Sequence, residues 1–458
     1  MSGAFFVALL IAAASAFLWG RKRGVALRDS GARVHSLPIY HGSFVALATA
    51  LPLLAVLLLW PPISSHLIEG RSIEALPQSM QPADSSSRAA LVREIAGVAS
   101  GEAIAKGAKP EIQAAAKSFN ELTATSLWLK TLVGGVLALL GLLWSSTKLK
   151  PDFRAQVPVE HFVEWALMGC SIVAILTTIG IVASVLFESL RFFANYPVLD
   201  FLFGTQWSPQ IAMRSDQVGQ SGAFGILPLF TGTMLITLIA ISVAAPIGLF
   251  AAIYMAEYAS SRMRAIVKPM LEILAGIPTV VFGFFAAITV APYIRTIGHS
   301  LGLDVASESA LAAGLVMGIM IIPFVSSLSD DVINAVPQSL RDGAYALGST
   351  KSETIKKVVL PAAFGGIVSA IMLAISRAVG ETMIVVMAAG LSGNLTFNPL
   401  DAVTTITVQI KTLLVGDQEF DSVKTLSAFA LGLVLFFFTL ALNWIALRIV
   451  GKYREQYE

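Results

Sequence analysis

The chain has 458 residues, of which 56% are apolar and only 13% carry a charge, and its mean hydropathy is +0.77. So few charged residues cannot cover one water-soluble core of this size, and the composition therefore predicts an integral membrane protein. The net charge of +2 arises from basic residues in short segments between apolar runs, which gives no reason to expect a nucleic-acid partner. The single cysteine, Cys170, excludes an internal disulfide, and the five histidines lack a ligand spacing, so we expect neither a metal nor a cofactor.

Apolar runs of about 20 residues, long enough to cross a bilayer, recur along the whole chain. They predict an all-α membrane protein with about nine transmembrane helices. The runs occupy residues 4–20, 43–62, 127–146, 162–187, 228–252, 269–293, 309–329, 361–390 and 426–449. An odd number of spans places the two ends of the chain on opposite sides of the membrane.

The distribution of lysine and arginine predicts the orientation of these spans. With the N-terminus outside, most basic residues fall in cytoplasmic segments. More than half of those assigned to the outside lie in one long outer segment, 64–126, where the positive-inside rule has little force. The first span is followed by Arg21, Lys22 and Arg23 and has no basic residue before it, which is the reverse of a cleavable signal peptide. We expect this span to be retained, although Ala-Ser-Ala at 14–16 also permits cleavage.

The predicted spans divide the chain into four parts. The outer segment between the second and third spans can hold two helices, one beginning near Ser85 and one after Pro110. This segment can be a helical cap or spacer, or it can have a specific docking role. The four parts are two N-terminal transmembrane helices at 1–63, a periplasmic helical segment at 64–126, a third transmembrane helix with a cytoplasmic linker at 127–160, and a six-span unit at 161–458.

A polar segment that contains several lysines separates two of the later spans on the cytoplasmic side. Pro337 can begin a helix at the start of this segment. Leu340, Ala344 and Leu347 then form a narrow apolar stripe along the helix. Gly348 is a natural end for it.

A second short helix can follow at once. Thr350 and Glu353 have the spacing of a capping box. The helix pair can dock into a groove of a soluble partner. It can equally lie on membrane lipid, held by Lys351, Lys356 and Lys357. The residues alone do not favour either interpretation.

This segment resembles the cytoplasmic signature of the inner-membrane permeases of bacterial ABC importers. That signature reads Glu-Ala-Ala, three residues, Gly, nine residues and Ile-x-Leu-Pro. The corresponding positions here are Asp342, Gly343, Ala344, Gly348, Val358, Leu360 and Pro361. The spacing matches, with Asp, Gly and Val in place of Glu, Ala and Ile, and Gly343 weakens its helix by about 0.5 to 1 kcal/mol relative to Ala. The resemblance implies coupling helices at about 331–360 that bind an ATPase.

Three further stretches resemble the PstC family of phosphate-specific permeases. They are FLFGTQWSP at 201–209, LEILAGIPTVVFG at 271–283 and SRAVGET at 376–382. The likeness covers roughly residues 160–455, and the choice of PstC over its paralogue PstA rests on the outer loop. The first 150 residues contain no motif of the short form and resemble the extended N-terminus of some longer members.

The resemblance implies a fold, partners and a location. The fold is the six-span core of a type I importer, similar to MetI, preceded by three extra spans. The partners are a PstA-like permease in a heterodimer, two PstB-like ATPase subunits and a periplasmic phosphate-binding protein, in a bacterial inner membrane. The chain lacks the Gly-x-x-x-x-Gly-Lys-Ser/Thr motif of a P-loop, so ATP hydrolysis is expected in the separate subunits.

A charged pair lies within the eighth span. At 1.5 Å per residue, Arg377 stands about 24 Å along the helix from Pro361, and Glu381 is one turn further. A charge at the bilayer centre costs about 2.5 to 3.5 kcal/mol, so the pair is expected to face a partner helix or a hydrated path. The alternative is that the two residues simply neutralise each other. The resemblance implies that this Arg and Glu, with Thr382 in the same motif, serve phosphate passage.

Two smaller groups of polar residues lie near the sixth and seventh spans. Pro278 can free a backbone carbonyl for the pathway and Thr279 can hydrogen-bond an oxyanion, although a plain kink with Thr279 bonded to its own backbone fits equally well. Glu272 belongs to the same group. Asp330 and Asp331 are expected to be solvated residues at the membrane boundary.

The sequence therefore predicts the permease subunit of an ATP-driven importer of inorganic phosphate. A permease for another oxyanion, such as sulfate or molybdate, is the closest alternative. A secondary anion transporter or channel is the alternative of another class, but it gives no reason for the helix pair on the cytoplasmic side. An enzyme is not favoured, because no nucleophile with a base stands out in the sequence.

Overall fold

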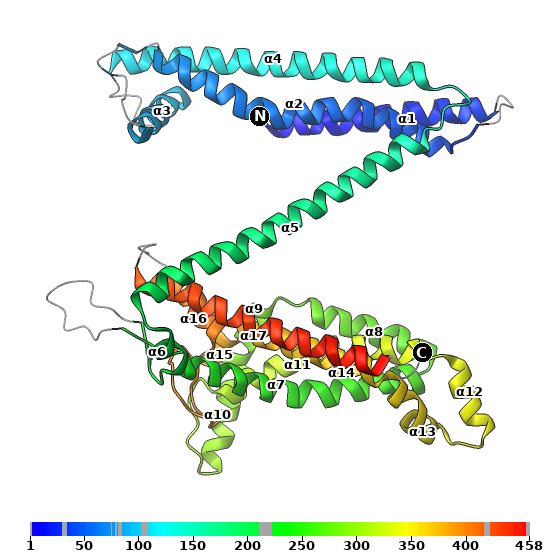
Figure 1. The fold of residues 1–458 in the computed structure, drawn as a ribbon, viewed down its shortest axis with the longest axis vertical. Coiled ribbons are helices and arrows are strands. Elements are labelled where there is room, and N and C mark those ends of the chain that lie inside the picture. Colours follow the sequence, from blue (N-terminus) through cyan, green and yellow to red (C-terminus); the bar gives the residue numbers. More distant parts are fainter. Residues whose placement is uncertain are drawn as a thin grey trace. The chain divides into compact units, whose positions relative to one another are not determined.

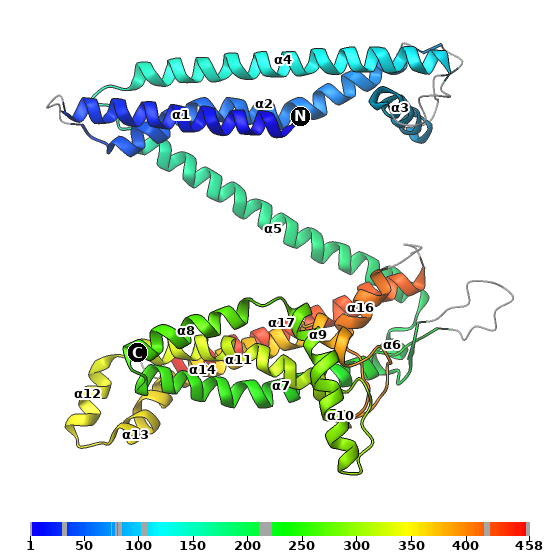
Figure 2. The same ribbon diagram turned by 180° about the vertical axis from the view of Figure 1, so that it is seen from behind.

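The computed structural model describes residues 2–29, 34–74, 76–77, 80, 85–101, 109–209, 222–415 and 422–454. Within these ranges nine helices are long and apolar enough to cross a membrane, as the sequence predicted. The chain forms two compact units, residues 1–176 and 177–458, and the boundary falls within the helix α5 (Gln156–Asn195). Figure 1 and Figure 2 show the helices of each unit from two sides.

The first unit is a bundle of three long helices with one short helix. They are α1 (Ser2–Asp29), α2 (Pro38–Glu74), α3 (Ser85–Ser100) and α4 (Pro110–Lys148). Glycines allow the long helices to approach closely, because a Cβ on Gly42 would overlap Phe17 of α1 and a Cβ on Gly141 would overlap the backbone of Ala48. Small residues at such contacts are typical of helices that pack within a membrane.

A small apolar cluster joins α3 to the beginning of α4. Its buried residues are Leu76, Ile95, Ile112, Ala115 and Ala116. The Asn120 side-chain amide also donates to the carbonyl of Ala99 at 3.0 Å. The predicted helix starts at Ser85 and Pro110 are confirmed. The second of these helices runs without interruption into the third span, because its sequence contains no proline after the first turn.

The second unit contains the remaining helices and one short hairpin. The helices are α6 (Val198–Phe203), α7 (Leu227–Ile253), α8 (Ser261–Gly276), α9 (Thr279–Phe285), α10 (Ala291–Ser300), α11 (Ala310–Ala335), α12 (Gln338–Ala346), α13 (Lys351–Thr354), α14 (Leu360–Val379), α15 (Met383–Ala388), α16 (Ile406–Leu414) and α17 (Val423–Arg454). Three π-helical segments continue these helices: η3 (Tyr254–Tyr258), η4 (Ala286–Val290) and η5 (Ile355–Val359). The hairpin pairs β1 (Trp207–Ser208) with β2 (Ala223–Phe224) in antiparallel register.

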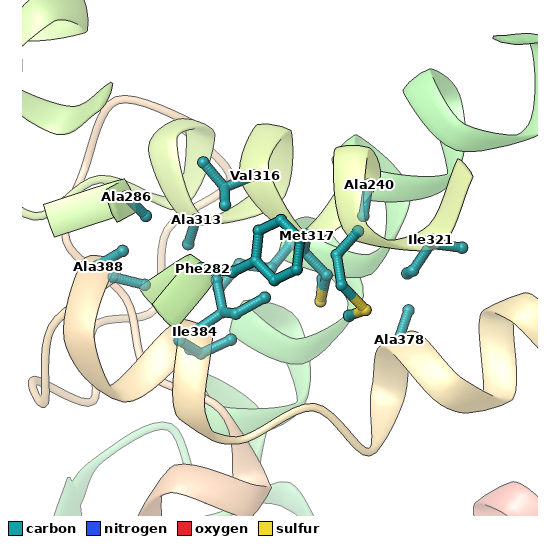
Figure 3. Close-up of a cluster of buried hydrophobic side chains, with 14 of the residues drawn as sticks. Ala240, Phe282, Ala286, Ala313, Val316, Met317, Ile321, Ala378, Ile384 and Ala388 are labelled. Carbon is teal, nitrogen blue, oxygen red and sulfur yellow. The ribbon is translucent and has the colours of Figure 1, made fainter. Parts of the chain in front are cut away.

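Helices α7 and α11 form the tightly packed centre of this unit. A Cβ on Gly314 would stand 2.7 Å from the Ile239 side chain, and a Cβ on Gly318 would stand 2.9 Å from the carbonyl of Ala240. The core continues from these helices to α9, α14 and α15. Figure 3 shows Phe282 of α9 and Met317 of α11 meeting in the middle of this cluster.

The predicted sixth span, 269–293, is not one helix. Helix α8 ends at Gly276 and α9 begins at Thr279, because Pro278 has no N–H to give to the carbonyl of Leu274. The N–H of Ile277 bonds that carbonyl instead, at 3.4 Å. The candidate membrane span in this region therefore runs from Thr279 to Ser300, and α8 is a separate helix.

Candidate functional site

The helix pair predicted between the seventh and eighth spans is present as α12 and α13. Pro337 precedes α12, and Gly348 follows it in a left-handed conformation with φ of +83°. The N–H of Glu353 donates to the Thr350 hydroxyl at 3.4 Å, and the Thr350 N–H donates to the Glu353 carboxylate at 3.0 Å. The capping box and both helix ends are therefore confirmed.

The residues of the signature differ in their exposure. Leu347 is 89% exposed and Leu340 is 44% exposed, whereas Ala344 is buried against the rest of the unit. The remaining positions of the signature are exposed at Asp342, Gly343, Gly348 and Pro361, and half-buried at Leu360. The predicted stripe thus splits into one anchoring alanine and two outward-facing leucines, and these leucines are free to meet a partner.

A buried arginine fixes α12 to the ends of two long helices. The Arg341 guanidinium donates to the Glu257 carboxylate of η3 at 3.1 Å, and both side chains are at most 10% exposed. It also donates to the carbonyls of Val336 and Ile333 at the end of α11. Arg341 therefore connects α12 with α7 and α11. The sequence analysis missed this residue, because Glu257 lies far away in the chain.

Asp330 is not the solvated residue that the sequence predicted. Its side chain is only 1% exposed, and it accepts hydrogen bonds from Arg264 at 3.0 Å and from Lys268 at 3.2 Å. The hydrogen bond to Asp330 raises the pKa of Lys268. Asp331, at 63% exposed, agrees with the prediction and makes only an outer contact with Lys268. This cluster joins α8 to α11.

Arg377 lies near the end of α14 and has no charged partner among the described residues. Its guanidinium stands 4.0 Å from the Met320 sulfur and 5.8 Å from the centre of the Phe324 ring. Both of these residues belong to α11. Arg377 itself is exposed. A thioether and a ring face leave the strong donors of a guanidinium unused.

Glu381 is not one helical turn beyond Arg377, because α14 ends at Val379 and the chain turns at Gly380. One oxygen of the Glu381 carboxylate accepts the N–H of Met383 at 3.0 Å, which caps α15. No ion pair joins Glu381 to Arg377 in the part of the chain that the structure describes. The alternative in which the two charges neutralise each other is therefore not the observed arrangement.

The other predicted pathway residues surround the same region. Thr382 begins α15 and is half-buried, and Thr279 begins α9 after the exposed Pro278. Helices α9 and α15 are neighbours, because a Cβ on Gly283 would stand 2.9 Å from the carbonyl of Met383. The Thr279 hydroxyl has no hydrogen bond to its own backbone within the described ranges. No hydrogen bond joins Thr279 to Arg377 or Glu381 in those ranges.

Two family models match the chain. Residues 244–455 match the binding-protein-dependent transport system inner membrane component. Residues 6–104 match a family described as a phosphate ATP-binding cassette transporter. The second match covers a region in which the sequence analysis found no usable motif.

Individual proteins also resemble the chain. A probable ABC transporter permease, YqgH of Bacillus subtilis, is 33% identical over 61% of this chain and 88% of its own length. The phosphate transport system permease PstC 1 of Mycobacterium tuberculosis is 34% identical over 56% of this chain and 82% of its own length. A solved structure of the MetNI methionine ABC transporter covers 50% of this chain and 94% of its own, with 17% identity and a TM-score of 0.37.

The family model of residues 244–455 covers the signature around α12 and α13. The matched parts of the relatives exceed four fifths of their length. The chain is a multi-pass membrane protein, and it belongs to the family of ABC transporter permeases that includes the PstC permeases, as its motifs predicted.

Proposed function

We propose that the chain is the transmembrane permease subunit of an ATP-driven importer that moves inorganic phosphate into the cytoplasm. The observation that carries this proposal is the guanidinium of Arg377, which has no charged partner among the described residues, in a chain related to PstC permeases. An arginine kept without a carboxylate partner in a membrane span is expensive unless it serves a substrate. Phosphate supplies the anion that this arginine lacks.

The chemistry of the two groups fits a partly protonated phosphate. Arg377 can offer two parallel N–H donors to phosphate oxygens. Glu381 uses one carboxylate oxygen to cap α15, and its other oxygen has no donor in the described chain. That oxygen can accept a hydrogen bond from a phosphate hydroxyl, whereas fully ionised sulfate would only be repelled. The hydroxyls of Thr382 and Thr279, and the break at Pro278, complete the proposed pathway.

The energy for this movement comes from partners in the proposal. PstB-like ATPase subunits bind the exposed face of α12 and α13, at Leu340, Leu347 and the neighbouring signature positions, which we place on the cytoplasmic side. Their closure pulls α12, and Arg341 transmits the displacement to α7 and α11 through its bonds to Glu257 and the end of α11. The core of 161–458 pairs with a PstA-like permease, and a phosphate-binding protein delivers substrate from the periplasm, where the N-terminus lies.

The proposal is tested with the assembled transporter in liposomes that contain ATP. Labelled phosphate should enter only when both the ATPase and the binding protein are present. Arg377→Gln should lower uptake by about tenfold to a hundredfold, the range expected when charged hydrogen bonds are lost. Glu381→Gln should reduce the preference for phosphate over sulfate. Arg262→Gln, an exposed arginine of α8, is the matched control and should leave uptake unchanged.

Three results would contradict this function. Normal uptake by an assembled Arg377→Gln complex would remove the proposed role of the arginine. Uptake by the purified chain without an ATPase would indicate a secondary transporter or channel. Preferred uptake of sulfate or molybdate would indicate a permease for another oxyanion.

A further inference from the structure

A polar cavity lies at the end of the 177–458 unit that carries α10. Figure 1 and Figure 2 place α10 at one end of this unit and α12 and α13 at the other. The cavity has a volume of about 570 Å³. This volume is in the usual range for small-molecule sites, about 300 to 1,000 Å³. Its polar lining comes from Arg295, Thr296, His299, Ser307 and Glu308.

The cavity contains one cationic side chain, Arg295, and one carboxylate, Glu308, besides the titratable His299. Among the described residues, Arg295 donates only one hydrogen bond, from its Nε to His299 Nε2 at 3.4 Å. No carboxylate lies within 4.0 Å of the Arg295 guanidinium among the residues that the structure describes. Glu308 faces the same cavity but is not paired with it. Because Arg295 and Glu308 line the same cavity and do not form an ion pair, a ligand can bind between them.

Glu308 is exposed, and its carboxylate lies next to the backbone of Gly390. A Cβ built on Gly390 would lie 3.0 Å from the Oε2 of Glu308. Gly390 itself has a φ of +91°. The neighbouring residues of its loop are bonded to another loop, through Ala306 N–H to Leu400 O and Ala310 N–H to Asp401 O. The backbone position of Glu308 is therefore set by the fold.

Helix α15 connects this cavity with Glu381. The helix begins after Glu381, and its last residues, Met387 and Ala388, line the cavity. Six residues of helix span about 9 Å. Figure 3 shows Ala388 beside Ala286 of η4, at the end of the core that is next to the cavity. The cavity thus lies about one short helix away from the proposed pathway residues.

We propose that this cavity is a receiving site that holds inorganic phosphate before it reaches Arg377 and Glu381. The inference rests on the proposed function. The free Nη donors of Arg295 bind phosphate oxygens, and the hydroxyls of Thr296 and Ser307 add further donors. Glu308 accepts the hydrogen of a protonated phosphate oxygen, so the site selects against fully ionised sulfate. A lipid phosphate group offers similar oxygens, and the test separates the two.

The experiment measures equilibrium binding of labelled inorganic phosphate to the assembled transporter, without ATP or binding protein. The Arg377→Gln complex in phosphatidylcholine nanodiscs is the starting point, so that the site at Arg377 does not contribute. This complex should still bind phosphate, and adding Arg295→Gln should weaken binding by about tenfold or more. Adding Glu308→Gln should let sulfate compete better. Adding Arg262→Gln should change nothing.

Other outcomes would overturn the receiving site. Unchanged phosphate binding after Arg295→Gln would exclude it. If that variant instead loses retained phosphatidylglycerol in mixed nanodiscs while phosphate binding is unchanged, the cavity is a lipid site. If it only weakens affinity for the binding protein, the cavity is a docking surface. Failure of the proposed function is seen separately, as normal uptake by Arg377→Gln.

Discussion

Two arginines of the second unit occupy opposite kinds of site. Arg341 is buried and bonded to Glu257 and to two carbonyls that end α11. Arg377 contacts only a sulfur and a ring face within the described chain. The fold has provided partners for the first arginine and none for the second. The comparison indicates that Arg341 holds the structure together, whereas Arg377 is available for a ligand.

The difference extends to the regions around them. At the end with α12, ionic contacts join separate helices, as Asp330 of α11 does with Arg264 and Lys268 of α8. Around Arg377 the core is made of apolar and small side chains such as Ala374, Ala378 and Met320. Ion pairs that join α12 to η3 and α8 to α11 can transmit a movement of α12 by a partner to the long helices. A site with few hydrogen bonds or ion pairs to the rest of the protein can bind and release an anion without losing interactions that stabilise the fold.

The strongest test of this comparison is to remove each arginine in turn. Arg341→Met should destabilise the protein by about 3 to 5 kcal/mol, because Glu257 is left buried and unpaired. Arg377→Met should not destabilise the protein, because no ion pair or strong hydrogen bond within the described chain is lost and a charge is removed from a membrane span. Thermal or denaturant unfolding of the purified complex measures both.

The double variant Arg341→Met with Glu257→Met is the control for this test. Removing both charges leaves no unpaired ion, so most of the lost stability should return. If the single and double variants are equally unstable, packing and not the ion pair holds α12 in place. If Arg377→Met is as harmful as Arg341→Met, the contrast between the two sites is wrong.

Leu347 tests whether the exposed face of α12 binds the ATPase. The side chain is 89% exposed, so Leu347→Asp should leave the stability of the permease unchanged. In the proposed assembly it places a charge in an apolar contact with the ATPase, and the affinity for that subunit should fall by about tenfold to a hundredfold. Binding of the ATPase to permease in nanodiscs measures this. Leu301→Asp, at a leucine that is 69% exposed beyond α10, is the matched control and should not affect the affinity.

The Asp330 cluster gives a prediction for alkaline pH. The hydrogen bond to Asp330 raises the pKa of Lys268 above its ordinary value of 10.5. A pKa raised by folding contributes stability that is complete below the unfolded pKa and is lost as the pH rises through the folded pKa. Wild type should therefore lose stability above about pH 10.5, where unfolded lysine releases its proton. Asp330→Asn should be less stable at neutral pH and should lose less across that alkaline rise.

Asp331→Asn is the matched control for this experiment, because Asp331 is 63% exposed and makes one outer contact with Lys268. Melting midpoints of both variants are compared from neutral to alkaline pH. Equal alkaline losses in the wild type and in Asp330→Asn would show that Lys268 does not contribute through Asp330.

The sequence predicted those features that depend on neighbouring residues. The ends of α12 and α13 follow from Pro337, Gly348 and the Thr350 to Glu353 capping box, which act within one or two turns. The number of spans follows from hydropathy in the same way, whereas the bounds of the sixth and eighth spans do not. The helix break at Pro278 could have been predicted from the sequence, since the missing N–H of proline is a local signal.

Contacts between distant parts of the chain were not visible in the sequence. Asp330 was predicted to be solvated because its partners on α8 lie more than sixty positions earlier. The Arg341 to Glu257 pair was missed for the same reason. The relation of Arg377 to Glu381 was misjudged for a local reason, because the chain turns at Gly380 before a further helical turn can form. A sequence pattern shows which charges enter the membrane, but only packing decides which of them find partners.

The smallest expected effect concerns Gly343, where this chain departs from the signature. A Cβ at Gly343 would have no heavy atom within 4 Å, and its φ is not positive, so alanine fits without strain. Gly343→Ala should therefore stabilise α12 by about 0.5 to 1 kcal/mol, because the unfolded chain loses freedom that glycine has. Hydrogen exchange of the α12 amides measures this local gain. Gly348→Ala is the opposing control, since its φ of +83° makes alanine strained there and should loosen the same helix. If Gly343→Ala also increases the affinity for the ATPase, the stability of α12 limits docking. If hydrogen exchange of α12 slows while the affinity is unchanged, the exposed leucines alone determine the affinity.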